Sequence, residues 1–220
     1  MAESDSIRKR FFFTLVSKVT VLAGSILTAG IVPRSIGVRN YGNVHFLLHF
    51  FKELKGLSDM SVSSAFFTLC SKKKKTGMLL LLYPLWELIQ LGLFAGLIGA
   101  AGVLDVRYFI WPGQKTPLIW AVAGVSMLMF WRNGVMRFAD SKKLTITAQV
   151  ISMMLSLVQV GVIVWLYAVS RLTLSTYIAV NYIVLAAIIL AVVLYVYRQR
   201  SFYWVDNRSW QRMKKIGRYF

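Results

Sequence analysis

Seven small or polar residues recur with helical spacing between positions 41 and 63, and several could bind an ion or a charged ligand. They are Tyr41, His45, His49, Lys52, Gly56, Asp59 and Ser63. At 100° per residue they fall within about 40° either side of one line along a helix. Cations on this stripe would attract a phosphate or pyrophosphate, whereas a carboxylate would take up a proton or a sodium ion. Glu53 and Lys55 lie on opposite flanks of the stripe.

The same residues do not predict an enzyme. His45 and His49 are spaced to share a metal ion, but no carboxylate completes an HExxH-type motif. The chain has a single cysteine, Cys70, and it contains no phosphate loop and no GxSxG sequence. We therefore expect no catalytic site, no metal site and no cofactor.

Composition indicates an integral membrane protein. The chain of 220 residues is 57% hydrophobic and 15% charged, and its mean hydropathy is +0.62. The net charge of +18 comes from short basic clusters between apolar runs. This distribution favours contact with a membrane surface and membrane lipids over binding to nucleic acid.

The apolar runs predict an all-α, polytopic protein with six transmembrane helices. About 20 apolar residues are needed to cross a bilayer. Five crossings are clear, and the sixth, over 41–70, contains the charged stripe. The expected spans are 11–32, 41–70, 77–104, 116–134, 146–169 and 175–197. A helix of 30 residues would rise about 45 Å, so we expect the second span to tilt, or to bend near Gly56 and Ser58.

Charge asymmetry supports the sixth crossing. With six spans, 18 of the 26 Lys and Arg residues lie on the side of both termini, and five lie on the other side. Because cytoplasmic loops are enriched in Lys and Arg, both termini are predicted to be cytoplasmic. The six-helix unit covers 1–198, and the basic, aromatic tail 199–220 is expected to lie along the inner leaflet.

Two further spans carry ionisable residues that could share an interior with the stripe. Lys18 lies in the first span, and Glu87 lies in the third, near Gln90. Such residues are rare in membranes and are generally functional. The predicted substrate-binding residues are Lys18, Lys52, His45 and His49, and the predicted ion- or proton-coupling residues are Asp59, Glu53 and Glu87. The alternative is that these charges form structural ion pairs.

Parts of the sequence resemble bacterial polysaccharide flippases of the O-antigen type, in the superfamily of multidrug and lipid II exporters. The resemblance includes a basic N-terminus, "IGVRNYG" after the first span, and "LSDMSVSSA" in the second. The later "WRNGVMRFADSKKLTITAQV" resembles the region between the fourth and fifth spans. The resemblance implies a transporter in the bacterial inner membrane that flips an oligosaccharide linked to undecaprenyl pyrophosphate. It also implies that Lys18 and Lys52 meet the diphosphate.

The chain departs from this family in length. Such flippases have twelve or more spans, so six spans resemble a single N-terminal lobe. We therefore expect a second lobe, a second chain or self-association to complete a transporter. The alternative is a scaffold or partner subunit that does not transport and whose buried charges are structural.

Overall fold

A computed structural model describes residues 7–59, 61–72, 77–104, 106–142 and 144–198. Every regular element within these residues is an α-helix. The helices are α1 (Ile7–Ile36), α2 (Val38–Asp59), α3 (Val62–Lys72), α4 (Gly77–Val103), α5 (Arg107–Ile110), α6 (Thr116–Ser141), α7 (Thr145–Ala168) and α8 (Leu174–Arg198). The prediction of an all-α fold is thus confirmed for this part of the chain, and the predicted tail 199–220 lies outside it.

Five of these helices are long and apolar enough to cross a membrane. The qualifying segments are Phe11–Ile36, Tyr83–Val103, Thr116–Ser141, Thr145–Ala168 and Leu174–Arg198. They coincide with five of the six predicted spans, and they indicate a multi-pass membrane protein. Many large apolar side chains on their outer faces are exposed, as expected for helices that contact lipid.

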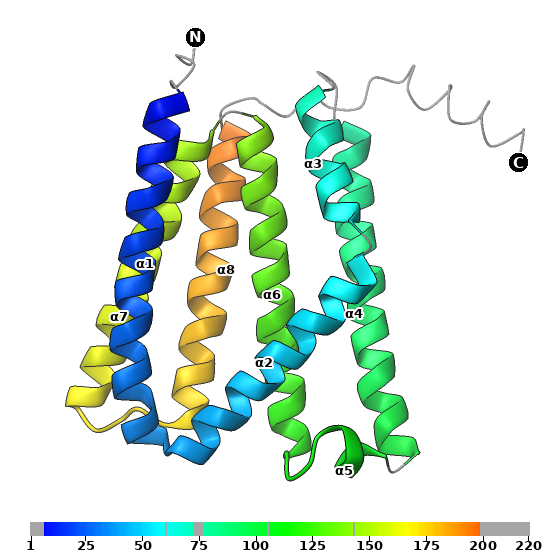
Figure 1. Cartoon of the computed structure of the whole chain (residues 1–220), viewed down its shortest axis with the longest axis vertical. Helices are drawn as coiled ribbons and strands as arrows, with labels where there is room; N and C mark the ends of the chain where they lie inside the picture. The colour runs from blue at the N-terminus through cyan, green and yellow to red at the C-terminus, as the bar shows by residue number, and fades with distance from the viewer. Residues whose placement is uncertain (1–6, 60, 73–76, 105, 143, 199–220) are drawn as a thin grey trace, which may run out of the picture.

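The region predicted as one helix over 41–70 is divided into two. Helix α2 ends at Asp59, and α3 begins at Val62 with a different direction (Figure 1). The backbone of Ser61 lies in the left-handed region, with φ of 67°. The division falls a few residues beyond the predicted flex point at Gly56 and Ser58.

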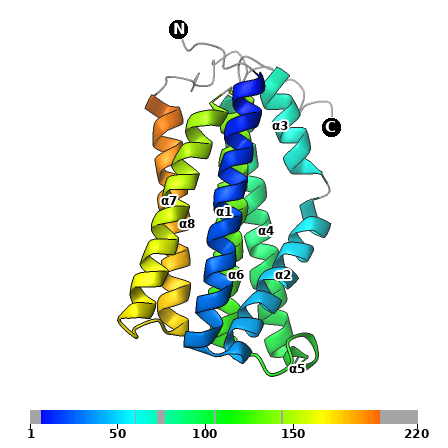
Figure 2. The ribbon, with the colours of Figure 1, turned by 60° about the vertical axis from the view of Figure 1, so that its left-hand side comes forward.

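Together, α2 and α3 run from one end of the molecule to the other. The chain turns at Gly37, whose φ of 86° suits glycine, and α2 then rises obliquely across α6 towards α4 (Figures 1 and 2). Helix α3 continues to the end at which α1 begins and α8 finishes. A contact fixes the opposite end, because Gln114 Nε2 donates a hydrogen bond of 3.0 Å to Asn43 Oδ1. The start of α2 therefore lies beside the loop that precedes α6.

Helix α6 lies at the centre and contributes to two of the three apolar cores that the described residues form. One core, shared with α2 and α4, includes Phe51, Phe94 and Ile119. A second core, shared with α3, α7 and α8, includes Phe138 and Ile188. Helix α1 packs mainly along α7. The oblique path of α2 therefore brings its middle and end against α4 and α6, where the candidate site lies.

Candidate functional site

The candidate site begins with a lysine on the buried face of α2. Val44, Leu47, Phe51 and Lys55 recur at intervals of three or four residues and are the buried residues of this helix. These four residues lie on a single face of the helix. Because Phe51 on this face is buried, Lys55 also points into the interior. Only 7% of Lys55 is exposed. Lys55, predicted on a flank of the polar stripe, is thus the buried cation of this helix.

Three polar side chains surround the Lys55 ammonium group. Lys55 Nζ lies 3.2 Å from Glu87 Oε1 and 3.3 Å from Asp59 Oδ1, and it also donates a hydrogen bond to Gln90 Oε1. Glu87 and Gln90 stand about one turn apart on α4 and are buried, with 1% and 0% of each exposed. We call Lys55, Asp59, Glu87 and Gln90 the charged cluster.

The charged cluster continues into the break between α2 and α3 through Asp59. Ser63 Oγ donates to Asp59 Oδ1 at 2.8 Å, and the backbone N–H of Ser63 donates to Asp59 Oδ2 at 3.3 Å. The first N–H groups of a helix have no partner within the helix. Asp59 therefore satisfies the first turn of α3 while it pairs with Lys55, so one carboxylate links the helix break to the buried cation.

Aromatic side chains enclose this region. The Tyr83 hydroxyl lies 3.3 Å from Ser63 Oγ, and the Tyr83 ring stacks on Phe66 with a centroid distance of 4.2 Å. The Phe130 ring centroid lies 5.6 Å from Lys55 Nζ, within the range of a cation–π contact. A Cβ at Gly134 would collide with the Tyr83 ring, so this glycine lets α6 approach α4.

The charges of the cluster do not balance. Two carboxylates surround one ammonium group, which leaves a formal excess of one negative charge at a buried position. In addition, Glu87 Oε2 and Gln90 Nε2 are buried and have no hydrogen-bond partner among the described residues. Uncompensated charge is costly at low dielectric. The cluster therefore places one cation, two carboxylates and two unpartnered buried polar atoms together at the break between α2 and α3.

The structure brings together only part of the predicted site. Asp59 and Glu87, predicted as coupling residues, meet through Lys55. Lys18, His49, Lys52 and Glu53 are exposed on the surface of the chain. His45 is partly buried beside Tyr41, with ring centroids 4.2 Å apart, and its Nε2 has no partner within the described regions. The predicted stripe thus borders the buried face of α2 and is only partly covered.

The residues that the structure describes hold no group of three His, Cys, Asp or Glu side chains arranged to bind a metal ion. Cys70 is buried in the core that includes Phe138.

Comparison with known proteins adds no assignment. The chain matches no family model, no curated protein and no solved structure at a significant level.

Proposed function

We propose that this chain is one lobe of a membrane transporter. The observation that carries the proposal is the charged cluster at the break between α2 and α3. Ionisable residues buried among membrane helices commonly mark the paths of substrates and ions. Broken helices at such sites are typical of secondary transporters. Lys55, Asp59 and Glu87 combine both features, because the Asp59 carboxylate contacts both Lys55 and the first turn of α3.

The arrangement of the helices supports a sixth crossing. Taken together, α2 and α3 join the two ends of the molecule (Figure 1). The hydrogen bond between Asn43 and Gln114 keeps the beginnings of α2 and α6 at one end. With six crossings, the Lys and Arg distribution favours cytoplasmic termini.

The proposed substrate is an oligosaccharide linked to undecaprenyl pyrophosphate, which the lobe would help to flip across a bacterial inner membrane. This substrate class rests on the sequence resemblance. Lys18, Lys52 and His49 are exposed and so are available to a diphosphate, with the partly buried His45 beside them on the stripe. Asp59 and Glu87 would couple substrate movement to a proton or cation. Exposed charges on α1 and α2 would be costly against lipid, so a second lobe or a second copy is proposed to cover them.

A scaffold is the second candidate function. A buried ion pair can fix the register of two helices without binding any substrate. The pairing of Lys55 with Glu87 also fits this role, because it joins α2 to α4. The two proposals differ in what happens when the charge of Glu87 is removed and its shape is retained.

Glu87→Gln provides the test, because glutamine can still accept a hydrogen bond from Lys55. The assay is complementation of a bacterial strain that needs this gene for surface polysaccharide, with the membrane abundance of the protein measured in parallel. A coupling role predicts loss of surface polysaccharide at normal abundance. A matched control is Arg171→Gln, which removes an exposed charge between α7 and α8. Normal polysaccharide with Glu87→Gln would exclude coupling through this carboxylate.

A further inference from the structure

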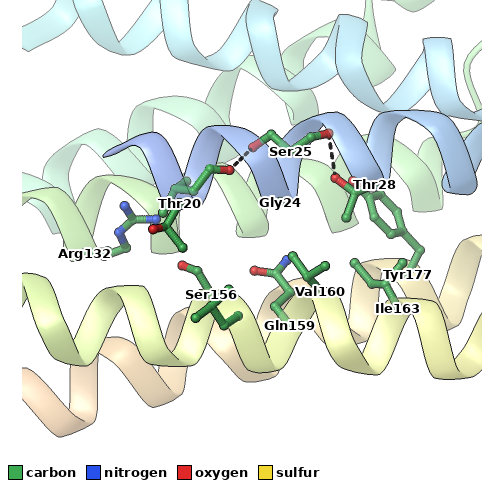
Figure 3. A pocket seen from close by; sticks show the side chains of 12 residues that line it. Thr20, Gly24, Ser25, Thr28, Arg132, Ser156, Gln159, Val160, Ile163 and Tyr177 are labelled. Carbon is green, nitrogen blue, oxygen red and sulfur yellow. Dashed lines mark hydrogen bonds between the residues drawn. The ribbon is translucent and has the colours of Figure 1, made fainter. Parts of the chain in front are cut away.

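A second polar region lies between α1 and α7, on a different face of α6 from the charged cluster. It is a partly open cavity of about 140 Å³ (Figure 3). Its polar lining comes from Thr20, Ser25, Thr28, Arg132, Ser156, Gln159 and Tyr177. Arg132 is two residues from Phe130 and from Gly134, which face Lys55 and Tyr83. A separation of two residues turns a helix by about 200°, which places Arg132 on the far side of α6.

Arg132 gives this cavity a positive charge that nothing in its lining neutralises. The lining contains no Asp, Glu or second cation, and Arg132 forms no ion pair within the described regions. Its Nε is buried and has no hydrogen-bond partner there. A guanidinium group stays charged under all physiological conditions, so it cannot relieve the cost of burial by losing its proton. The cavity therefore attracts an anion.

Arg132 also lies deep along its helix. It is 16 residues after Thr116, or about 24 Å along a helix of about 39 Å. It is also 9 residues, or about 14 Å, from the end of α6 at Ser141. Arg132 therefore lies within the bundle and not at the end of its helix.

The other polar groups leave few donors for that anion. The hydroxyls of Thr20, Ser25 and Thr28 donate to backbone carbonyls of α1 at 2.9 Å. Gln159 Nε2 donates to Asn181 Oδ1 at 3.1 Å. Ser156 lies at the same end of the cavity as the Arg132 guanidinium (Figure 3). Arg132 and Ser156 are thus neighbouring donors at one end of the cavity, whereas Tyr177 lies at the other end (Figure 3).

We propose that this cavity binds a phosphate-class oxyanion through Arg132 and Ser156. The planar guanidinium group matches two oxygens of a phosphate. A water molecule needs about 10–15 Å³ of such a cavity, so 140 Å³ holds a tetrahedral oxyanion with some hydration. An oligosaccharide does not fit. The ligand is a free phosphate or the phosphomonoester headgroup of a lipid, which share this chemistry.

Thermal unfolding of the purified full chain in mild detergent tests the proposal. One arm titrates inorganic phosphate at constant ionic strength, with chloride as the reference. A second arm titrates phosphatidic acid in mixed micelles, with phosphatidylcholine as the reference. We expect a rise in Tm over the reference in at least one arm. A response to phosphate identifies a free anion as sufficient, and a response to phosphatidic acid alone identifies a lipid headgroup.

Variants then locate the binding. Arg132→Gln should weaken the apparent affinity about tenfold or more, because it removes a charge-assisted hydrogen bond. Ser156→Ala should weaken it less and serves as a second variant if Arg132→Gln folds poorly. Arg137→Gln is the matched control, since Arg137 is an exposed residue of the same helix.

Two results would overturn the proposal. One is no rise in Tm with either ligand, and the other is an equal rise in the wild-type, Arg132→Gln and Ser156→Ala proteins. Glu87→Gln should bind phosphate like the wild type, because Glu87 lies on the other side of α6. A failure of oxyanion binding would therefore not contradict the transport proposal, and a failure of transport would not contradict oxyanion binding.

Discussion

Lys55 of α2 and Glu87 of α4 are 32 residues apart in the chain, and their charged atoms lie 3.2 Å apart in the interior. The pair holds the oblique helix against a helix that crosses the whole molecule. Asp59 contacts the same ammonium group at 3.3 Å. Because one cation serves two carboxylates, its removal affects both of them.

Lys55→Met should therefore be strongly destabilising. Loss of the ammonium group leaves Asp59 and Glu87 without their cation, and an uncompensated buried charge costs about 3–5 kcal/mol. Thermal unfolding in detergent would show this as a large fall in Tm. Lys52→Met is the control, because Lys52 is exposed one turn earlier on the same helix and should change stability by about 0.5 kcal/mol or less. Equal falls in the two variants would contradict the assigned role of Lys55.

Removal of both charges should be milder than removal of one. The double variant Lys55→Met with Glu87→Leu leaves Asp59, which retains its hydrogen bonds to Ser63. An apolar pair of similar volume often replaces a buried ion pair with little loss. We expect the double variant to unfold at a higher temperature than Lys55→Met alone. If the two losses simply add, Lys55 and Glu87 are not energetically coupled.

The residues of the charged cluster also show how much of the candidate site could be predicted from the sequence alone. Helical spacing singled out Asp59, and its place within an apolar run singled out Glu87. The structure brings both carboxylates beside Lys55. The helical spacing did not predict that Lys55 is buried, because Lys55 lies on a flank of the polar stripe. Lys55 lies on the same helix face as Val44, Leu47 and Phe51, which is the face that the structure buries.

The break between α2 and α3 could be predicted only in part. The length of 41–70 indicated a bend, and Gly56 offered a flexible position, but α2 continues through Gly56 to Asp59. At the break, Asp59 accepts two hydrogen bonds from Ser63, in the first turn of α3. No proline or glycine marks Ser61 in the sequence.

Ser61 itself gives a prediction. Its φ of 67° lies where β-branched side chains are strained, so Ser61→Val should cost about 1–2 kcal/mol. Ser61→Gly should be neutral or stabilising, because glycine adopts this conformation freely. Unfolding temperatures of the two variants provide the comparison. A more stable valine variant would indicate that α2 and α3 form one continuous helix.

Gly134 should resist even the smallest substitution. A Cβ at this position collides with the Tyr83 ring, so Gly134→Ala should force α4 and α6 apart and cost about 1–3 kcal/mol. Gly161→Ala in α7 is the control, since a Cβ there meets nothing within 4 Å. The Tm of Gly134→Ala should fall, and that of Gly161→Ala should not. A smaller side chain at position 83, as in Tyr83→Leu, should restore part of the loss.

The path of the chain across the membrane can be tested at two positions, Arg39 and Lys115. Both are exposed, and the hydrogen bond between Asn43 and Gln114 holds these regions at one end of the molecule. If α2 and α3 together cross the membrane, both positions lie on the same side. If they do not cross, the single pass of α4 puts the two positions on opposite sides. Single cysteines at 39 and 115, in a Cys70→Ser background, distinguish these cases.

A membrane-impermeant maleimide applied to intact cells supplies the measurement. With six crossings and cytoplasmic termini, Arg39→Cys and Lys115→Cys should both be labelled without permeabilisation. Ser141→Cys, at the far end of α6, should be labelled only after permeabilisation. Labelling of just one of positions 39 and 115 would contradict the sixth crossing. Lys55 and Asp59 would then lie outside any crossing helix, and the coupling role proposed for their contact with Glu87 would lose its support.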